Sequence, residues 1–308
     1  MPLNVLIAID KFKGTFTSVE IASLIEKKIK SELNCTTRII PVSDGGQGFL
    51  ESILFAKKFH QIKLSTVNAI FEPIETICLV DNDTCYIESS KIIGIDILTK
   101  DKQNPCKTSS FGLGLVLKQC IERGYKKIIV GLGGSATNDA GMGMADALGA
   151  VFSDDKGNKL EPIGENLVRV CNLEISKLQN IIQNIEFTAL CDVENPLFGE
   201  NGAAYCFAAQ KGANMKQIEL LDKGLQNIFK LSNFFEDIQS QTFFGSAGGL
   251  GFGFNFFLNA NLFSGAEKII EILQVEKKIC ECDVLITGEG KFDEQSMNGK
   301  ITGKLIDL

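Results

Sequence analysis

Short apolar runs alternate with longer amphipathic segments in the first fifty residues, and a polar loop stands at each transition. The apolar run from Asn4 to Ile9 predicts a strand that is covered on both faces. Thr17 and Glu20 form a capping-box pattern in the next segment, which predicts the start of a helix. The repeated order of strand, loop and helix is typical of a parallel sheet. Ligands are therefore expected beyond the carboxyl ends of the strands.

Two segments have apolar residues at helical spacing and are predicted to be amphipathic helices. One follows Thr17, and the other spans residues 216–234. Their predicted apolar faces are Ile21, Leu24, Ile25 and Ile29 in the first, and Ile218, Leu221, Leu225 and Ile228 in the second. A further helix is predicted over 111–123, and further strands over 38–42, 77–80, 85–88, 127–130, 185–190 and 284–286. The single histidine, His60, lies in a lysine-rich stretch and is interpreted as a solvated helix end.

The length of 308 residues exceeds that of an average domain, which favours two domains that share one cleft. The pattern between about Ile62 and Glu88 supports this interpretation, because short strands follow one another there without long helices. Hydrophobic residues make up 44% and charged residues 22% of the chain, the balance of an ordinary globular protein. We therefore expect an α/β protein with a full core.

The net charge of −7 argues against a nucleic-acid partner, whose phosphates would require a basic surface. The N-terminus has no basic region before its apolar strand, and no apolar run approaches the length that spans a bilayer. The ten cysteines are scattered without a C-x-x-C pair and are interpreted as reduced thiols. These features predict a soluble cytoplasmic protein. Because the chain has one histidine, a catalytic base is sought among its carboxylates.

A glycine-rich turn over 131–139 follows the strand predicted at 127–130 and precedes a helix that is expected from about Gly141. Glycines at Gly133 and Gly134 would let backbone N–H groups approach a phosphate, and the helix N-terminus would add partial positive charge. Ser135 and Thr137 supply hydroxyl donors. A tight turn without a ligand is an equally good interpretation. The turn is not a Walker A loop, because no Gly-Lys-Ser/Thr follows.

The same turn also fits a dinucleotide fingerprint, since Gly131, Gly133 and Ala136 have the required spacing and Asp154 stands about where a ribose-binding acid belongs. Two observations count against this alternative. The motif is far from the start of the predicted sheet, and residues 138–139 would put polar and acidic groups at the pyrophosphate.

Polar and charged residues also follow other predicted strands. Asp10, Lys13 and Asp44 follow the first two strands, where carboxylates suit Mg²⁺ or proton abstraction and a lysine suits a phosphate or carboxylate. Asp192 follows the strand predicted at 185–190, with Lys211 farther along the same loop system. Each of these, taken alone, is well explained as a turn or surface residue. Together they favour a binding site at the strand ends.

These segments, taken together, resemble the bacterial glycerate kinase family that uses neither a P-loop nor a protein-kinase fold. The matching motifs run nearly from end to end. They are residues 10–14 (DKFKG), 43–46 (SDGG), 104–105 (NP), 111–112 (FG), 133–139 (GGSATND), 191–197 (CDVENPL), 210–213 (QKGA), 247–251 (AGGLG), 287–290 (TGEG) with Asp293, and 299–300 (GK).

The resemblance implies a flavodoxin- or Rossmann-like parallel-sheet domain and an inserted mixed α/β domain, with the active site in a cleft between them. We expect the first to comprise residues 1–66, 108–160 and 281–308, and the second 67–107 and 161–280. The resemblance also implies ATP with Mg²⁺ and D-glycerate as substrates and phosphoglycerate, usually the 2-phosphate, as product. Family members continue past the motif at 299–300 with further strands and helices.

Roles for single residues are hypotheses at this point. The nucleotide phosphates are assigned to Gly133, Gly134, Ser135, Thr137 and Asn138. Lys13 and Lys211 would neutralise the moving phosphoryl group or the glycerate carboxylate. Asp192 is the first choice for the base and Asp44 the second, and Mg²⁺ is assigned to Asp139 or Glu289.

The chain departs from the family pattern at two positions. Gln47 stands in place of a glutamate, and Leu115 stands where a charged or amide residue is usual after Gly114. Two alternatives to an active kinase stay open. One is a shortened, catalytically impaired relative that only binds ligand, and the other is an NAD-dependent oxidoreductase built on the turn at Gly131.

Overall fold

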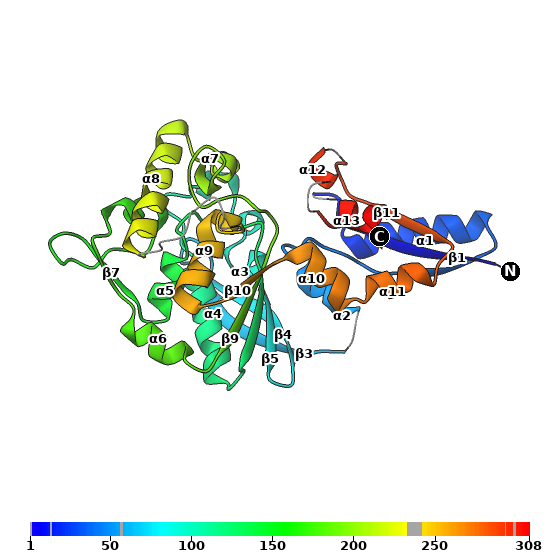
Figure 1. The fold of residues 1–308 in the computed structure, drawn as a ribbon, viewed down its shortest axis with the longest axis horizontal. Helices are drawn as coiled ribbons and strands as arrows, with labels where there is room; N and C mark the ends of the chain where they lie inside the picture. The colour runs from blue at the N-terminus through cyan, green and yellow to red at the C-terminus, as the bar shows by residue number, and fades with distance from the viewer. Residues whose placement is uncertain (1, 13, 56–57, 233–241, 293, 298–299) are drawn as a thin grey trace. The chain divides into compact units, whose positions relative to one another are not determined.

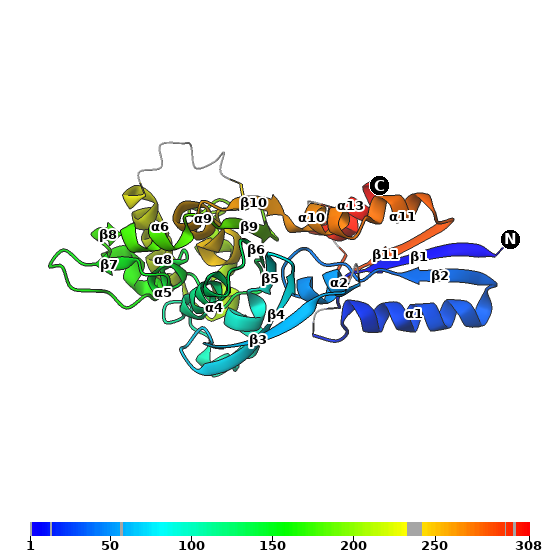
Figure 2. The same ribbon diagram turned by 90° about the horizontal axis from the view of Figure 1, so that it is seen from below.

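The computed structural model describes residues 2–12, 14–55, 58–232, 242–292, 294–297 and 300–308 (Figures 1 and 2). The chain folds into two compact units. Unit 1 comprises residues 1–59 and 264–308, and unit 2 comprises residues 60–263. Each unit has its own sheet. The expected α/β class with two domains is confirmed.

Unit 1 is built on a three-stranded parallel sheet in the order β11-β1-β2. Its strands are β1 (Leu3–Ile9), β2 (Cys35–Ile39) and β11 (Val284–Gly288). Its helices are α1 (Ser18–Glu32), α2 (Phe49–Leu54), α10 (Gly265–Ile272), α11 (Val275–Cys280), α12 (Glu294–Met297) and α13 (Ile301–Asp307). Figure 2 shows the strands between α1 on one side and α10, α11 and α13 on the other. Because both faces are covered, β1 is apolar along most of its length.

The first helix begins as its sequence predicts. The Thr17 side chain accepts a hydrogen bond from the Glu20 backbone N–H, and the Glu20 carboxylate accepts one from the Thr17 N–H. The predicted apolar face is wrong at one position, because Leu24 is 51% exposed. Ala22 is the residue of α1 that is fully buried against the sheet, and Ile25 lies beside it.

Unit 2 is built on a six-stranded mixed sheet in the order β10-β9-β6-β5-β4-β3. Its strands are β3 (His60–Val67), β4 (Pro73–Asp81), β5 (Thr84–Glu88), β6 (Lys127–Gly131), β9 (Glu186–Cys191) and β10 (Asn261–Ser264). Strands β5, β6 and β9 run parallel, whereas β3, β4 and β5 form an antiparallel meander. A separate hairpin consists of β7 (Val151–Ser153) and β8 (Asn172–Glu174).

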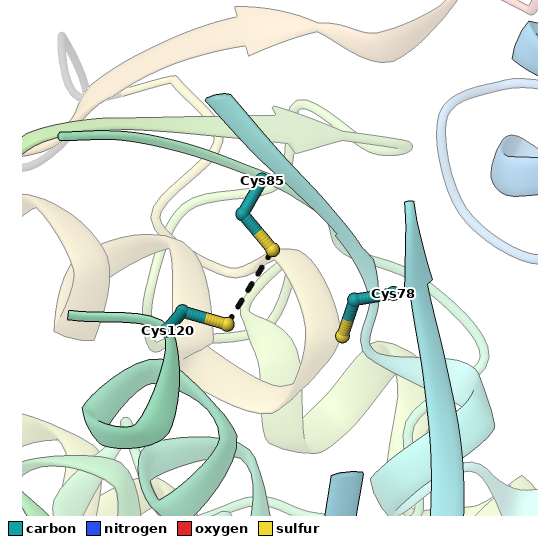
Figure 3. Close-up of side chains that lie close together, drawn as sticks. All are labelled: Cys78, Cys85 and Cys120. Atoms are coloured by element: carbon teal, nitrogen blue, oxygen red, sulfur yellow. Dashed lines mark hydrogen bonds between the residues drawn. The ribbon is translucent and has the colours of Figure 1, made fainter. Parts of the chain in front are cut away.

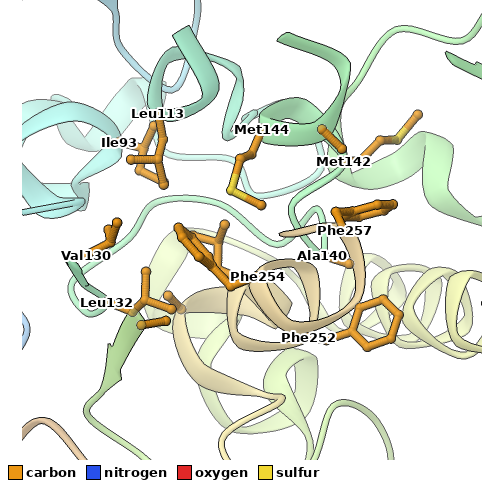
Figure 4. Close-up of a cluster of buried hydrophobic side chains, with 14 of the residues drawn as sticks. Ile93, Leu113, Val130, Leu132, Ala140, Met142, Met144, Phe252, Phe254 and Phe257 are labelled. Carbon is orange, nitrogen blue, oxygen red and sulfur yellow. The ribbon is translucent and has the colours of Figure 1, made fainter. Parts of the chain in front are cut away.

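The helices of unit 2 pack around this sheet. They are α3 (Ser90–Ile93), α4 (Phe111–Glu122), α5 (Met142–Ala147), α6 (Ser176–Ile182), α7 (Ala203–Phe207), α8 (Met215–Leu231) and α9 (Ser246–Leu258), with 3-10 turns η1 (Ile95–Ile97), η2 (Lys100–Lys102), η3 (Gly164–Arg169) and η4 (Ala209–Lys211). Figure 4 shows Leu113 of α4, Met144 of α5 and Phe254 of α9 in one buried cluster. The predicted apolar face of α8 is confirmed, because all four of its residues are buried.

The structure differs from the expected domain boundaries. Residues 108–160 were expected in the domain of the N-terminal strand, but β6 pairs with β5 and β9, and the whole segment lies in unit 2. An apolar strand does not encode which sheet it joins, so its sequence could not decide this. The interpretation of His60 is also wrong, since His60 begins β3. The strand expected at 38–42 is β2, which ends at Ile39.

No helix within the described ranges combines the length and the apolar character that crossing a membrane requires.

Candidate active site

The carboxyl ends of three adjacent parallel strands lie at one edge of the unit 2 sheet. Gly131, the last residue of β6, is in register with Glu88 of β5 and with Leu190 of β9. The residues after these three strands therefore lie at the same edge. They include the glycine-rich turn that follows Gly131 and the side chain of Asp192. Binding sites of parallel sheets are built at such an edge.

The glycine-rich turn has a residue with left-handed backbone at Gly134. This residue has φ +61° and is exposed, and its carbonyl accepts a hydrogen bond from the Ile95 N–H at 2.9 Å. The Thr108 hydroxyl donates to the Ala136 carbonyl at 2.8 Å and holds the next part of the turn. Ser135 is 3% exposed. The turn therefore presents Gly134 at the surface while its polar side chains lie below.

Asp139 is fully buried and binds the start of the following helix. Its Oδ2 accepts hydrogen bonds from the N–H of Ser110 at 2.7 Å, the hydroxyl of Ser110 at 2.7 Å and the N–H of Gly143 at 3.1 Å. Burial raises the pKa of Asp139, and these hydrogen bonds oppose the rise. The Ser110 hydroxyl also accepts a hydrogen bond from the Met144 N–H at 2.9 Å. The prediction that the N-terminus of α5 adds positive charge for an anion is therefore wrong, because Asp139 and Ser110 already bind the amides of its first turn.

A second glycine-rich turn, at the start of α9, lies against the first. Ala247, Gly248 and Gly249 have φ values of +52°, +75° and +88°. A Cβ on Gly248 would lie 2.0 Å from the carbonyl oxygen of Thr137, which no side chain can accommodate without a backbone shift. Glycine at this position thus permits contact between the two turns.

Lys211 reaches the first turn from η4. Its Nζ donates to the carbonyl oxygen of Thr137 at 2.7 Å and to the Ser135 hydroxyl at 3.2 Å. The residue is 4% exposed, and burial lowers the pKa of its ammonium to about 8, while Asp192 and then Asp139 oppose this shift. The structure thus brings together two residues, Lys211 and Ser135, that the sequence proposes for the same site.

Several buried polar atoms near the turn have no hydrogen-bond partner within the described part of the chain. They are Thr137 Oγ1, Asn138 Oδ1, Asn138 Nδ2 and Ser89 Oγ. Ser89 belongs to the same strand edge, because its N–H donates to the Gly131 carbonyl at 3.0 Å. Unpartnered buried polar groups are rare in native proteins. Their position beside a buried ammonium fits a polar or anionic ligand.

Asp192 lies one residue beyond β9 and is half-buried. Its Oδ1 accepts a hydrogen bond from the Ser246 hydroxyl at 3.0 Å. Ser246 begins α9, so the second glycine-rich turn also orients this carboxylate. Sequence reasoning did not select Ser246, and its separation of 54 residues from Asp192 explains why.

Sequence reasoning also missed the end of β5. Glu88 is 2% exposed, and its Oε1 accepts a hydrogen bond from the Ser90 hydroxyl at 2.7 Å. A Cβ built on Gly134 would be in ordinary contact, 3.6 Å, with the Cβ of Ser90. An acid at the end of a buried strand was the signal that could have identified this pair.

The Asp154 side chain, which the dinucleotide alternative assigned to a ribose, accepts hydrogen bonds from the N–H groups of Lys156 and Asn158 in its own turn.

Unit 1 has a separate cluster of charged residues at the strand ends of its own sheet. Asp10 follows β1, and its N–H donates to the Gly288 carbonyl of β11 at 3.0 Å. Asp44 accepts a hydrogen bond from the Ile301 N–H at 2.6 Å, and Glu289 forms an ion pair with Lys300 at 3.0 Å. Lys13 lies outside the described residues, so its role stays a prediction.

The carboxylates of unit 1 influence one another. Burial raises the pKa of Asp10 to about 6, and Asp44 and Glu289 add to this rise, whereas Lys11 opposes it. Burial also raises the pKa of Asp44, against the hydrogen bond from Ile301. Glu289 Oε1 is buried and has no hydrogen-bond partner within the described residues. Buried carboxylates that raise one another's pKa are a suitable environment for a cation.

The two departures from the family pattern lie in ordered segments. Gln47 is half-buried in the turn before α2, and Leu115 is half-buried within α4.

Comparisons with known proteins agree with the motifs at the strand ends. The model of the glycerate kinase family matches residues 5–308. The glycerate kinase of Bacillus subtilis (strain 168) is 33% identical over 306 residues, which cover 97% of this chain and 79% of the relative. The glycerate 2-kinase of Escherichia coli (strain K12) is 34% identical over 304 residues, which cover 97% of this chain and 80% of the relative.

The fold comparison gives the same result. A crystal structure from Salmonella typhimurium LT2, assigned as a glycerate kinase 2, superposes with a TM-score of 0.80 at 31% sequence identity. The match covers 98% of this chain and 82% of that chain. The family match, the identities and the fold agree over nearly the whole sequence. The chain belongs to the glycerate kinase family.

Proposed function

We propose that this chain catalyses the ATP-dependent phosphorylation of D-glycerate, with the 2-phosphate as the favoured product. Membership of a kinase family implies ATP use, and the relative from Escherichia coli is a glycerate 2-kinase. The observation that carries the proposal is the buried ammonium of Lys211 at the glycine-rich turn. Beside it lie side-chain atoms of Thr137 and Asn138 that have no hydrogen-bond partner among the residues the structure describes. Phosphoryl transfer needs mainly positioned groups that neutralise charge.

We assign the nucleotide phosphates to the turn at Gly133, Gly134, Ser135, Thr137 and Asn138. The exposed Gly134 permits close approach of a phosphate to the backbone, and its φ of +61° is one that other residues rarely adopt. Lys211 supplies the positive charge. The hydrogen bonds of Lys211 to Ser135 and Thr137 hold the ammonium at the turn before any ligand binds.

Asp192 is the proposed base that accepts the proton of the glycerate hydroxyl. It is half-buried, it follows a strand of the same sheet edge, and the Ser246 hydroxyl fixes one of its oxygens. A carboxylate that is held in place and partly open to solvent is suited to this task. Asp44, whose carboxylate accepts the Ile301 N–H, is the second choice because that bond gives it a structural role.

Mg²⁺ is part of the proposal, and its two candidate ligands differ in their surroundings. The Asp139 carboxylate already accepts four hydrogen bonds from Ser110, Gly141 and Gly143, so the fit to a metal is poor. Glu289 retains a buried oxygen that has no partner among the described residues, which fits a hard cation. We therefore favour Glu289. When bound, Mg²⁺ would neutralise charge on phosphate oxygens.

The decisive experiment is a coupled assay of ADP release with the purified chain, ATP and Mg²⁺. D-glycerate should support turnover, and glycerol, which lacks the carboxylate, should not. Phosphorus NMR of the product distinguishes the 2-phosphate from the 3-phosphate. ATP binding without turnover would favour the impaired relative, and a change in NADH fluorescence on mixing would favour the oxidoreductase.

A further inference from the structure

Three cysteine side chains form a cluster inside unit 2 that the proposed kinase reaction does not use. Cys78 lies on β4, Cys85 on β5 and Cys120 in the last turn of α4. Their Sγ atoms all lie within 4.8 Å of one another, and those of Cys85 and Cys120 are 3.4 Å apart. Figure 3 shows the sulfurs of Cys85 and Cys120 pointing toward each other, with the side chain of Cys78 next to them. The three thiols are therefore close enough together to bind one centre.

The fold explains why these residues meet. Cys85 pairs with Val80 across the antiparallel β4–β5 ladder, so Cys78, two residues from Val80, projects from the same face of the sheet. Cys120 continues the buried stripe of α4 that includes Val116 and Leu117. Cys85 is the second residue of β5, whereas Glu88 is its last, so the cluster lies at the opposite end of that strand from the candidate active site.

The surroundings of the sulfurs decide which ion the cluster suits. All three cysteines are fully buried in the apolar core of the unit. No fourth histidine, cysteine, aspartate or glutamate joins the group within the described ranges. Zn²⁺ at a structural site takes four ligands, and three thiolates around it leave one net negative charge. Cu⁺ also binds thiolates well, but three thiolates around it leave two net negative charges. An unbalanced charge in an apolar interior is costly.

The cluster therefore suits a centre that needs only three ligands and leaves no net charge. A trivalent, thiophilic centre bound to three sulfurs meets both requirements. We propose that Cys78, Cys85 and Cys120 form a binding site for a trivalent metalloid hydroxide of the arsenite type. In the reaction As(OH)₃ + 3 RSH → As(SR)₃ + 3 H₂O, each As–O bond is replaced by an As–S bond. Each thiol proton leaves with a hydroxide as water. Arsenic stays trivalent, so no oxidant or reductant takes part.

The turn that ends α4 lies next to the cluster in the sequence and is the segment whose local opening would expose it. Tyr125 is half-buried, and its N–H donates to the Cys120 carbonyl at 3.3 Å. Tyr125 also packs against the buried core that contains the three cysteines. The adjoining Arg123 and Gly124 are exposed. Local opening of this turn, without unfolding of the sheet, would admit a small neutral hydroxide.

The test uses the full chain, kept reduced with a phosphine, and sodium arsenite as the probe. Native mass spectrometry should show one adduct whose mass gain is one arsenic atom less three hydrogens, because three thiol protons are lost. Arsenic X-ray absorption should show three sulfur neighbours and no oxygen. The Cys85→Ala and Cys120→Ala variants should each lose the three-bond adduct. The control variants Cys171→Ser and Cys206→Ser, at exposed cysteines, should keep it.

Circular dichroism establishes whether each alanine variant is folded. If a variant fails to fold, anomalous scattering at the arsenic edge from crystals of the unmodified adduct locates the atom instead. Arsenic among Cys78, Cys85 and Cys120 supports the proposal. Four other results would overturn it: no adduct, a mass gain that retains a hydroxyl, an adduct that survives in folded Cys85→Ala, or preferential binding of Zn²⁺ under the same conditions.

Discussion

The ammonium nitrogen of Lys211 lies 2.7 Å from the carbonyl oxygen of Thr137, although 74 residues separate the two in the chain. This bond joins η4 to the glycine-rich turn and places a cation beneath the proposed phosphate site. Burial lowers the pKa of that cation to about 8. The charge on which phosphate binding would depend is therefore sensitive to pH in the range where kinases are assayed.

We expect kcat/KM to fall as the pH rises through about 8. The pKa of Lys211 in the folded protein is below its ordinary value of 10.5, so the ammonium loses its proton first in the native state. Stability should change in the opposite direction to kcat/KM and increase as Lys211 loses its proton. The buried charge carries a penalty on folding that is fully present below the folded pKa and disappears as the pH rises to the unfolded pKa. A pH profile of kcat/KM that stays flat across this range would contradict the prediction.

Lys211→Met should reduce kcat/KM by roughly a hundredfold, the effect of removing one charge-stabilising donor. Methionine retains most of the side-chain volume, so circular dichroism should be unchanged while ATP turnover falls. Lys216→Met, at an exposed lysine on the neighbouring α8, is the matched control and should retain activity. Equal activity of the two variants would remove Lys211 from the site.

Asp192→Asn should reduce kcat by about 10²–10⁴-fold, because an amide cannot accept the substrate proton. The amide oxygen can still accept the hydrogen bond from Ser246, so the thermal unfolding midpoint should change little. Glu194→Gln removes an exposed acid two residues away and serves as the control. Normal turnover of folded Asp192→Asn would exclude Asp192 as the base.

Gly248→Ala should destabilise the protein strongly, by about 3 kcal/mol or more, because a left-handed backbone and a backbone clash are combined. The new Cβ would lie 2.0 Å from the Thr137 carbonyl oxygen. Gly157→Ala is a sharp control, since Gly157 has φ +81° and no atom of the described residues lies within 4 Å of its added Cβ. The free energy of unfolding of both variants, measured in urea, separates the cost of the left-handed backbone from the cost of the clash. Equal destabilisation would show that the contact between the two turns is unimportant.

Asp10→Asn should stabilise the protein at neutral pH by at most about 3 kcal/mol, since the raised pKa reports the cost of its buried charge. The pKa of Asp10 rises from 3.8 to about 6 on folding. Its contribution to stability is therefore greatest below pH 3.8 and is lost as the pH rises through about 6. The gain from asparagine should vanish in acid. Urea unfolding at several pH values tests this, with the exposed Asp307→Asn as control.

Local features of the fold were predictable because their signals are close together in the sequence. The capping box of Thr17 and Glu20 forms as expected, and α8 buries its predicted face. The strand that ends at Gly131 and the turn after it were also predicted. The exposure of Leu24 was not predicted, because helical spacing alone does not say how wide a stripe of the helix the sheet covers.

Partners that are distant in the sequence could not be predicted in this way. Ser246 orients Asp192 and Ser110 binds Asp139, and each pair is joined only by the packing of separate helices and turns. The buried set of hydrogen bonds on Asp139 likewise has no local signal, so the sequence suggested a metal ligand. The roles of the single site residues stay predictions that the experiments above address.

The sequence by itself determined the α/β class, the family and the loops that carry polar residues at strand ends, because these depend on local periodicity and on motifs read in order. Tertiary structure decided which sheet β6 joins, which turn Lys211 reaches and that Cys78, Cys85 and Cys120 meet. The physical reason is that strand pairing and helix packing depend on complementary surfaces far apart in the chain. A short stretch of residues does not specify which distant segment it will contact.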